Sequence, residues 1–485
     1  MSGPDPVLGA TLPSTGVILA GGVAALVVTA ALVLAMRRSE QVFPLLAVFA
    51  LPFRLPISTG GRTVNLLIPL YLVVAAGTID YLLGRLSGPA AAGAPHAGGE
   101  PGDVPAPASS SPPGAPARGH ATETVVRAWF SPRGVQALLF GAVALYALQS
   151  IYSADHAKAA ENIAFFYIPF ALLFLLLRQV RWTPQLLLRC LGVAVVEAVV
   201  LAGIGFVEYD RKSLFLNPKV VAANQYDNYF RVNSLFFDPN IYGRFLAIVM
   251  IAVSTVVLWS TQRRHILAGA AVLAWLLGGL VTSFSQSSIA ALLLGLAILA
   301  AWRFDVRRTL YVSVGLLALA GALVLLAPAS LHFGLKGSGG STSNATSGRT
   351  KLISGGLELF AQRPLQGYGP GSFEKEYKSH RKANAENATS ASHTIPVTVA
   401  AEQGVIGLAV YFALLLAALI VLFRGAGRSP PRIALGACFA ALVLHTWTYA
   451  DFLEDPFTWA LLAIGLALAA EQMRPPGAVA ARAGQ

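Results

Sequence analysis

One histidine stands where a polar segment gives way to a long apolar run. His393 ends the stretch "SASH" and precedes "TIPVTVAAEQGVIGLAVYF". We expect a helix over 394–401, with Pro396 in its first turn, where the missing N–H costs little. An imidazole there, with an ordinary pKa of about 6.5, suits a general base that takes a proton from an acceptor hydroxyl. The alternative is that His393 only caps or packs the helix start.

Two arginines in other polar segments have the right chemistry to hold a phosphate group. Arg231 lies in "YFRVNSLFFDPNIYGRF" and Arg349 lies in "SGRTKLISGGLELF". A guanidinium is planar and permanently charged, and its paired donors match the oxygens of a phosphate. The alternative is that both are solvated surface cations, and the two interpretations stay equally open on these residues alone.

Other residues could bind an anionic headgroup or lipid near these three. The candidates are Arg54, Arg244, Lys351 and Tyr368. Tyr368 belongs to "GYGPGSF", which does not stand between a strand and a helix and is therefore a weak nucleotide signal. No Asp-x-Asp and no His/Cys cluster with metal-ligand spacing occurs in the sequence, so we expect neither a metal nor another cofactor. We expect the acidic group at 451–455 to be solvated.

The composition is that of a chain whose solvent is largely lipid. Of the 485 residues, 55% are hydrophobic and only 12% are charged, and the mean hydropathy is +0.63. Soluble proteins carry about 25% charged residues, so the recurring apolar runs predict a polytopic membrane protein. The net charge of +12 then indicates basic cytoplasmic loops rather than nucleic-acid binding. Cys190 and Cys438 fall inside apolar runs and are expected to be packing residues.

Apolar runs of about 17–25 residues predict about thirteen transmembrane helices. They are expected near 16–36, 41–57, 64–84, 134–152, 160–178, 185–207, 240–260, 265–282, 286–302, 309–327, 405–423, 432–450 and 457–471. The first is too long for a cleavable signal peptide, and prolines interrupt the second. If the spans alternate, the short arginine-bearing loops all fall on one side, which should be the cytoplasm. Arg54 and Glu197 are the clearest charges inside apolar runs, and such charges are functional candidates.

The predicted fold class is an all-α polytopic membrane protein with a large helical outer loop. We expect transmembrane helices one to three at 1–84, helices four to ten at 134–327 and helices eleven to thirteen at 405–471. On the cytoplasmic side we expect a disordered linker at 85–133 and a tail at 472–485. On the outer side we expect a loop at 208–239 and a large loop with active-site residues at 328–404. The linker is rich in Pro, Ala, Gly and Ser and has almost no large apolar residue, so it cannot bury enough surface to fold.

Three of these segments together resemble a known family. "RVNSLFFDPNIYG", "GRTKLISGGLELFAQRPLQGYGPGSF" and "HTIPVTVAAEQGVIGLAVYF" are similar in order and in position relative to the spans to the O-antigen ligase and polymerase superfamily of bacterial surface-polysaccharide enzymes. The likeness covers roughly 225–425. Family members usually have His-Asn where this chain has His393-Thr394, which removes support for a role of the asparagine but not of the histidine.

The resemblance implies a GT-C-like, metal-independent glycosyltransferase in the bacterial inner membrane, with its active site facing the periplasm or exterior. It implies that Arg231 and Arg349 hold the pyrophosphate of an undecaprenyl-linked glycan and that His393 is the catalytic base. The partners would be that donor, a glycan or lipid acceptor and membrane lipids, with no nucleic acid. A single base without a carboxylate nucleophile suggests inversion, by analogy with glycoside hydrolysis.

Several alternatives remain open in the sequence. The motifs fit a ligase and a polymerase equally, and they leave the sugar and the oligomeric state undefined. The main alternative of another class is a transporter or flippase of lipid-linked oligosaccharide. Such proteins carry internal repeats and broken helices near the membrane midplane, whereas no internal repeat is evident here and the distinctive residues fall in outer loops.

Overall fold

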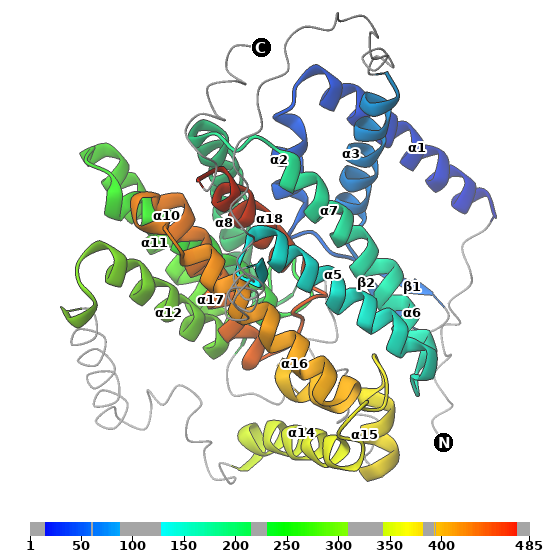
Figure 1. Cartoon of the computed structure of the whole chain (residues 1–485). Coiled ribbons are helices and arrows are strands. Elements are labelled where there is room, and N and C mark those ends of the chain that lie inside the picture. Colours follow the sequence, from blue (N-terminus) through cyan, green and yellow to red (C-terminus); the bar gives the residue numbers. More distant parts are fainter. Residues whose placement is uncertain are drawn as a thin grey trace, which may run out of the picture.

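The computed structural model describes residues 15–59, 62–87, 128–214, 230–308, 343–381, 392 and 394–472. Within these residues the chain is a helical bundle with one short hairpin (Figure 1). Most of the expected linker, the predicted span at 309–327, the tail after 472 and His393 itself lie outside the described residues.

In the described part of the chain, nine helices are long and apolar enough to cross a membrane. They are α1 (Thr15–Arg38), α3 (Ile68–Ser87), α5 (Pro132–Gln149), α6 (His156–Asn162) continued through a π-helical turn into α7 (Ile168–Gln179), α8 (Pro184–Arg211), α10 (Pro239–Trp259), α11 (Arg263–Thr282), α12 (Gln286–Arg303) and α16 (Ile395–Phe423). The predicted spans at 432–450 and 457–471 correspond to α17 (Pro430–Trp447) and α18 (Pro456–Gln472), which are slightly shorter or less apolar. The all-α polytopic membrane fold predicted from composition is confirmed.

The predicted second span at 41–57 is wrong. In its place α2 (Val42–Ala50) has only 9 residues, and β1 (Leu55–Thr59) then pairs antiparallel with β2 (Arg62–Leu66). A proline disfavours helical backbone in the residue before it and cannot donate a helical hydrogen bond, so Pro52 and Pro56 account for the early end. At 1.5 Å per residue α2 is too short to cross about 30 Å of hydrocarbon.

The segment around α2 still connects opposite ends of the bundle. Gln41 accepts a hydrogen bond from Arg189, near the start of α8. Arg54 donates to the carbonyl oxygen of Glu454, between α17 and α18, at 3.4 Å. The chain therefore runs from one end of the bundle to the other as a short helix followed by extended residues. The later helices still alternate in direction as predicted.

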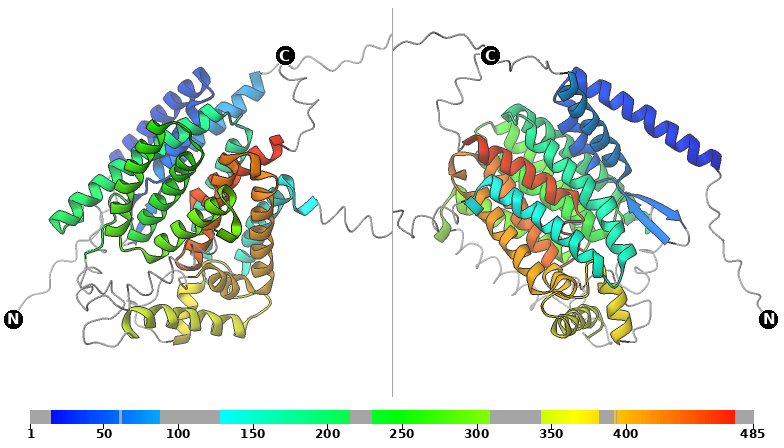
Figure 2. Two further views of the ribbon diagram at one scale, coloured as in Figure 1. Left: turned by 90° about the vertical axis from the view of Figure 1, so that its left-hand side faces the viewer. Right: turned by 45° about the vertical axis from the view of Figure 1, so that its right-hand side comes forward.

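Antiparallel packing gives the bundle two chemically different ends. The segments at 150–155, 230–238, 283–285, 363–372 and 448–455 meet at one end, which we call the site end. The arginine-bearing connections at 178–183, 260–264, 303–308 and 424–432 lie at the other, which we call the basic end. α14 (Ser343–Gln362) and α15 (Phe373–Arg381) lie across the site end (Figure 2). The described residues of the predicted large outer loop at 328–404 thus form α14, α15 and the start of α16, with a non-helical connection at 363–372.

Polar caps explain where the helices that lead to and from the site end begin. Ser131, Thr183 and Asp238 each stand directly before a proline and cap α5, α8 and α10 with a side-chain oxygen. Asp238, for example, accepts the backbone N–H of Asn240 at 2.6 Å. An oxygen-bearing cap followed by proline satisfies one orphan N–H and removes another. α10 then runs through the middle of the bundle, where 78% of its spanning window is buried.

α16 contains a break at Gly404 that receives the connection between α14 and α15. Gly404 has φ 65° and ψ −164°, a conformation essentially restricted to glycine. The backbone N–H of Val405 donates to the carbonyl oxygen of Pro364 at 2.8 Å, and that of Gly369 donates to the carbonyl oxygen of Glu402 at 2.8 Å. A Cβ at Gly404 would lie only 2.3 Å from the carbonyl oxygen of Leu365. The break therefore joins the helices over the site end to a spanning helix.

Gly404→Ala is expected to destabilise the protein, because the substitution adds both backbone strain of about 1–3 kcal/mol and a main-chain clash. The measurement is the thermal unfolding temperature of the purified protein in detergent. Gly141→Ala is the matched control, since a Cβ at Gly141 meets nothing within 4 Å. Equal unfolding temperatures for the two variants would show that the break is not required.

Candidate active site

Arg231 is held between the first turn of α10 and the turn that joins α11 to α12. Its Nε donates to the carbonyl oxygen of Ser283 at 3.2 Å, and its Nη2 donates to Asn240 Oδ1 at 3.3 Å. The next backbone N–H, of Val232, donates to the carbonyl oxygen of Thr282 at 3.2 Å. The guanidinium is half-buried and has a defined position at the site end.

The backbone after Arg231 is also attached to α8. The N–H of Ser234 donates to Oε2 of the buried Glu208 at 2.7 Å, and its hydroxyl donates to the carbonyl oxygen of Leu201 at 2.8 Å. Ser234 has φ 51°, a left-handed conformation that costs a non-glycine residue energy. These two bonds offset that cost, so the segment from Arg231 to Asp238 is fixed on two sides.

A buried chain of polar side chains continues from Arg231 into the bundle. Asn240 Oδ1 also accepts from Ser285 Oγ at 2.9 Å. Ser285 Oγ lies 2.7 Å from Ser288 Oγ, which lies 3.1 Å from His445 Nε2. None of these four residues is among the site residues predicted from the sequence. The polar run "SFSQSS" between two apolar stretches was the available signal for the serines, whereas nothing local marked His445 as their partner.

The loop at 448–455, between α17 and α18, is closed by a buried ion pair. Arg244 Nη2 lies 2.5 Å from Asp455 Oδ2, and each side chain is 2% exposed. Arg244 Nη1 also donates to the carbonyl oxygens of Ala450 and Asp451, at 3.3 and 3.2 Å. The expectation of a solvated acidic group is therefore wrong for Asp455. Arg244 has a protein partner where a substrate anion was expected, and its role in binding substrate stays a prediction.

Glu454 of the same loop faces the other half of the bundle. Its Oε1 accepts from the hydroxyl of Tyr167 at 2.9 Å, and its carbonyl oxygen accepts from Arg54. Burial raises the pKa of the Glu454 carboxyl, and the nearby Asp451 raises it further. Arg54, predicted to bind pyrophosphate or lipid, thus lies at the site end and joins this loop to the β1–β2 side of the bundle.

Lys351, Arg349 and Tyr368 belong to the helices that cover the site end. Lys351 is exposed on α14, which also contains Arg349. The hydroxyl of Tyr368 donates to Gln362 Oε1 at 2.5 Å, and the Arg363 guanidinium lies 4.4 Å from the centre of its ring. Burial raises the pKa of Tyr368, which keeps the phenol a neutral donor. Tyr368 therefore packs the end of α14, and its role in binding substrate stays a prediction.

The residues on either side of His393 are fixed to the first turns of α16. The hydroxyl of Ser392 donates to the carbonyl oxygen of Thr394 at 2.7 Å, and its N–H donates to Thr398 Oγ1 at 3.1 Å. α16 begins at Ile395 with Pro396 in its first turn, which confirms the predicted helix start. The side chains of Arg349 and His393 lie outside the described residues, so their meeting with Arg231 around one pocket stays a prediction.

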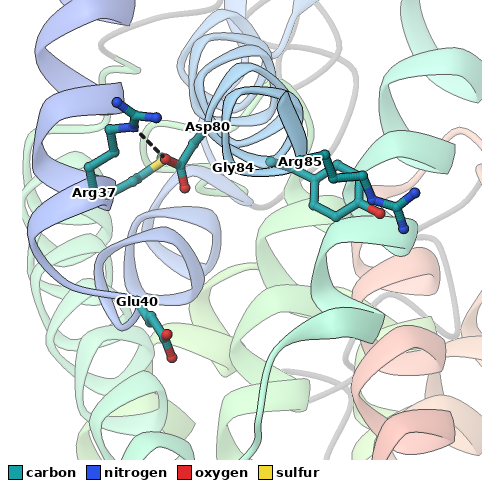
Figure 3. Close-up of a pocket in the computed structure, with 7 residues that line it drawn as sticks. Arg37, Glu40, Asp80, Gly84 and Arg85 are labelled. Atoms are coloured by element: carbon teal, nitrogen blue, oxygen red, sulfur yellow. Dashed lines mark ion pairs between the residues drawn. The ribbon is translucent and has the colours of Figure 1, made fainter. Parts of the chain in front are cut away.

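A pocket of about 610 Å³ lies between α1 and α3 at the basic end (Figure 3). It is lined by Met36, Arg37, Glu40, Asp80, Tyr81, Gly84 and Arg85. Arg37 Nε lies 3.5 Å from Asp80 Oδ1, and the Arg85 guanidinium lies 5.0 Å from the centre of the Tyr81 ring. This pocket is at the opposite end from Arg231 and is not part of the candidate active site.

In the part of the chain that the structure describes, no three His, Cys, Asp or Glu side chains gather as a metal site. His393 and part of the site end fall outside that part of the chain. Metal independence therefore stays a prediction, supported by the absence of an Asp-x-Asp motif from the sequence.

Residues 271–412 match a family model described as O-antigen ligase. This segment of the chain is similar to the O-antigen ligase family. The matched segment runs from within α11 to within α16 and includes Arg349 and His393, whereas Arg231, Asn240 and His445 lie outside it. A comparison with curated proteins finds no match to this chain.

The match confirms the family resemblance seen in the sequence motifs. An O-antigen ligase domain indicates an enzyme that transfers glycans, with a lipid-linked glycan and an acceptor as its general partners. Together with the nine apolar helices of the described residues, it indicates a multi-pass membrane enzyme.

Proposed function

We propose that this protein is a metal-independent, inverting glycosyltransferase. It transfers a glycan from undecaprenyl pyrophosphate to an acceptor hydroxyl at the outer face of the bacterial inner membrane, as an O-antigen ligase or a polysaccharide polymerase. The observation that carries the proposal is the O-antigen ligase domain at 271–412, which contains Arg349 and His393. Support comes from Arg231, whose guanidinium is bonded to Ser283 inside that domain.

Arg231 and Arg349 hold the pyrophosphate in this mechanism. When the bond between the anomeric carbon and the pyrophosphate oxygen breaks, negative charge grows on the leaving group. Guanidinium groups that are already oriented stabilise this charge without reorganising during the reaction. They take the place that a metal ion has in many phosphate-transfer sites, and their paired donors match the oxygens of a pyrophosphate.

His393 acts on the acceptor. Its imidazole takes the proton from the acceptor hydroxyl while the hydroxyl oxygen attacks the anomeric carbon. One bond forms and one breaks on opposite faces of the sugar, so a single displacement inverts the configuration. The prenyl pyrophosphate leaves with the electron pair of the broken bond.

The distribution of charge supports the orientation of the site. The basic end gathers the arginines of the short connections, and the positive-inside rule assigns such an end to the cytoplasm. The site end then faces the periplasm or exterior, where a lipid-linked glycan is presented after it has crossed the membrane.

Reconstitution of the purified protein in liposomes tests the proposal. We expect transfer from an undecaprenyl-pyrophosphate glycan without an ion gradient, at an unchanged rate in EDTA, and with inverted anomeric configuration in the product. Movement of the donor across the bilayer without any transfer would support a flippase instead. Product length, read on a gel with lipid-linked and lipid acceptors, separates a polymerase from a ligase.

A further inference from the structure

We propose that Asn240, Ser285, Ser288 and His445 form a directional hydrogen-bond chain that orients Arg231. Asn240 is the member in contact with the guanidinium, and His445 is the anchoring donor at the far end. All four are positioning residues rather than catalytic ones. The inference rests on the proposed function, because it concerns how the arginine of that mechanism is held.

The chain is built from three separate helices and is shielded from water. Asn240 lies in the first turn of α10, the serines lie at the start of α12, and His445 lies in the last turn of α17. The exposed fraction is 6% for Asn240 and 0% for Ser285, Ser288 and His445. Buried polar groups are costly unless they are paired, so a continuous set of bonds here restricts each side chain to one arrangement.

The number of hydroxyl protons determines the direction of the hydrogen-bond chain. Each serine has one hydroxyl proton. Arg231 Nη2 can only donate, so the Asn240 atom that it contacts at 3.3 Å must be the accepting Oδ1, and Ser285 must donate to that oxygen across their 2.9 Å contact. The 2.7 Å contact between the serines then requires Ser288 to donate to Ser285.

Ser288 has no second proton for His445. Its longer contact, 3.3 Å to the carbonyl oxygen of Asn240, would also need that one proton. The shorter contact, 2.7 Å to Ser285, takes this proton, so the 3.1 Å contact with the imidazole requires Nε2–H of His445 to donate to Ser288 Oγ. The order is therefore His445, Ser288, Ser285, Asn240, with every hydroxyl pointing toward the arginine.

The Asn240 amide can face only one way. Its Oδ1 accepts from both Ser285 and Arg231 Nη2, and a flipped amide would set an NH₂ group against the guanidinium, which can only donate. With Oδ1 fixed, and with Nε bonded to the carbonyl oxygen of Ser283, the plane of the guanidinium is defined at two points. A phosphate-binding fork depends on this plane, because paired donors match the ligand in only one orientation.

The hydrogen-bond chain also explains why residues outside the matched segment are needed to orient Arg231. Ser285 and Ser288 lie within 271–412, whereas Asn240 and His445 lie on either side of it in the sequence. The hydrogen bond between Ser288 and His445 spans 157 positions. The geometry of Arg231 thus depends on three segments that meet only in the folded bundle.

Variants of the full-length protein in liposomes test this inference. His445→Leu and Ser285→Ala each interrupt the chain, and misplacing a reacting group by about 1 Å can cost on the order of 10² in rate. We expect kcat to fall by about tenfold to a hundredfold, with a KM for the donor that changes much less, because the arginine is needed most in the transition state. His445→Gln is expected to restore most of the rate, since its side-chain NH₂ can donate near the position of Nε2.

Ser287→Ala is the matched control. Ser287 is buried in the same turn, but its hydroxyl donates to the carbonyl oxygen of Thr448 and is not part of the chain. We expect its kcat to equal that of the wild type. Equal losses in His445→Leu and His445→Gln, or kcat losses matched by lower unfolding temperatures in every variant including Ser287→Ala, would overturn the inference in favour of general packing.

Arg231→Ala distinguishes a failure of the positioning chain from a failure of the proposed function. If Arg231→Ala loses transfer while His445→Leu and Ser285→Ala keep wild-type kcat, the positioning chain is wrong and the proposed function stands. If Arg231→Ala keeps full transfer, the role of this arginine in the proposed function fails, whatever the other variants show.

Discussion

His393→Ala will bind the lipid-linked donor and fold like the wild type, but its kcat will fall by about 10²–10⁴, the range that general-base catalysis contributes. In the proposed mechanism, the alanine leaves no group to take the acceptor proton as the new bond forms. The flanking Ser392 and Thr394 keep their bonds to each other, because these bonds do not use the imidazole. The measurement is single-turnover transfer in liposomes, alongside donor binding.

His156→Ala is the control for the loss of a histidine at the same end of the bundle. His156 is exposed, and its Nε2 lies 3.1 Å from the carbonyl oxygen of Ile151. We expect its kcat to be unchanged. In the wild type, the rate should fall at low pH as the catalytic base becomes protonated, and His393→Ala should lack this fall. Full transfer by purified His393→Ala would remove this residue from the mechanism.

Arg231→Lys will lower kcat by about 10²–10³, comparable to the removal of one preorganised donor from a transition-state site. A lysine keeps the positive charge, but it cannot reach both the carbonyl oxygen of Ser283 and Asn240 Oδ1 while presenting a planar fork to a pyrophosphate. The comparison of kcat with donor KM in Arg231→Lys and Arg231→Ala tests this. The two variants should be similarly impaired, because orientation matters here as much as charge.

Arg264→Ala provides the control for a lost arginine. Arg264 is exposed at the basic end, with its Nε bonded to Gln262 Oε1. Its removal should leave transfer unchanged in liposomes. If Arg231→Lys works as well as the wild type, charge alone is sufficient, and a fixed guanidinium is not required.

The spanning helices could be predicted from the sequence because lipid leaves the chain few choices. An apolar run long enough to cross the membrane must be helical to pair its backbone groups. The start of α16 was also predictable, because Pro396 suits the first turn of a helix and the preceding residues are polar. The span at 41–57 failed because apolarity was given more weight than Pro52 and Pro56, which end α2 early.

The buried polar contacts could not be predicted from local pattern. Arg244 lies in a mostly apolar helix and Asp455 in a short loop, and nothing near either residue indicates the other. In the same way, Ser288 and His445 become partners only when α12 packs against α17. These four side chains gain their partners only through tertiary packing. A polar residue in an apolar run therefore does not show by itself whether it binds substrate or stabilises the fold.

In the proposed mechanism, the break at Gly404 sets the depth in the membrane at which transfer takes place. From 405 to 423, α16 rises about 28 Å at 1.5 Å per residue, close to the roughly 30 Å thickness of the hydrocarbon layer. If these residues span the hydrocarbon layer, as proposed, the part before Gly404 lies at the level of the lipid headgroups, where the proposed mechanism places the pyrophosphate of the donor. A donor that diffuses laterally in the leaflet would then reach the enzyme with its sugar already at the depth of the site end, without being lifted out of the bilayer.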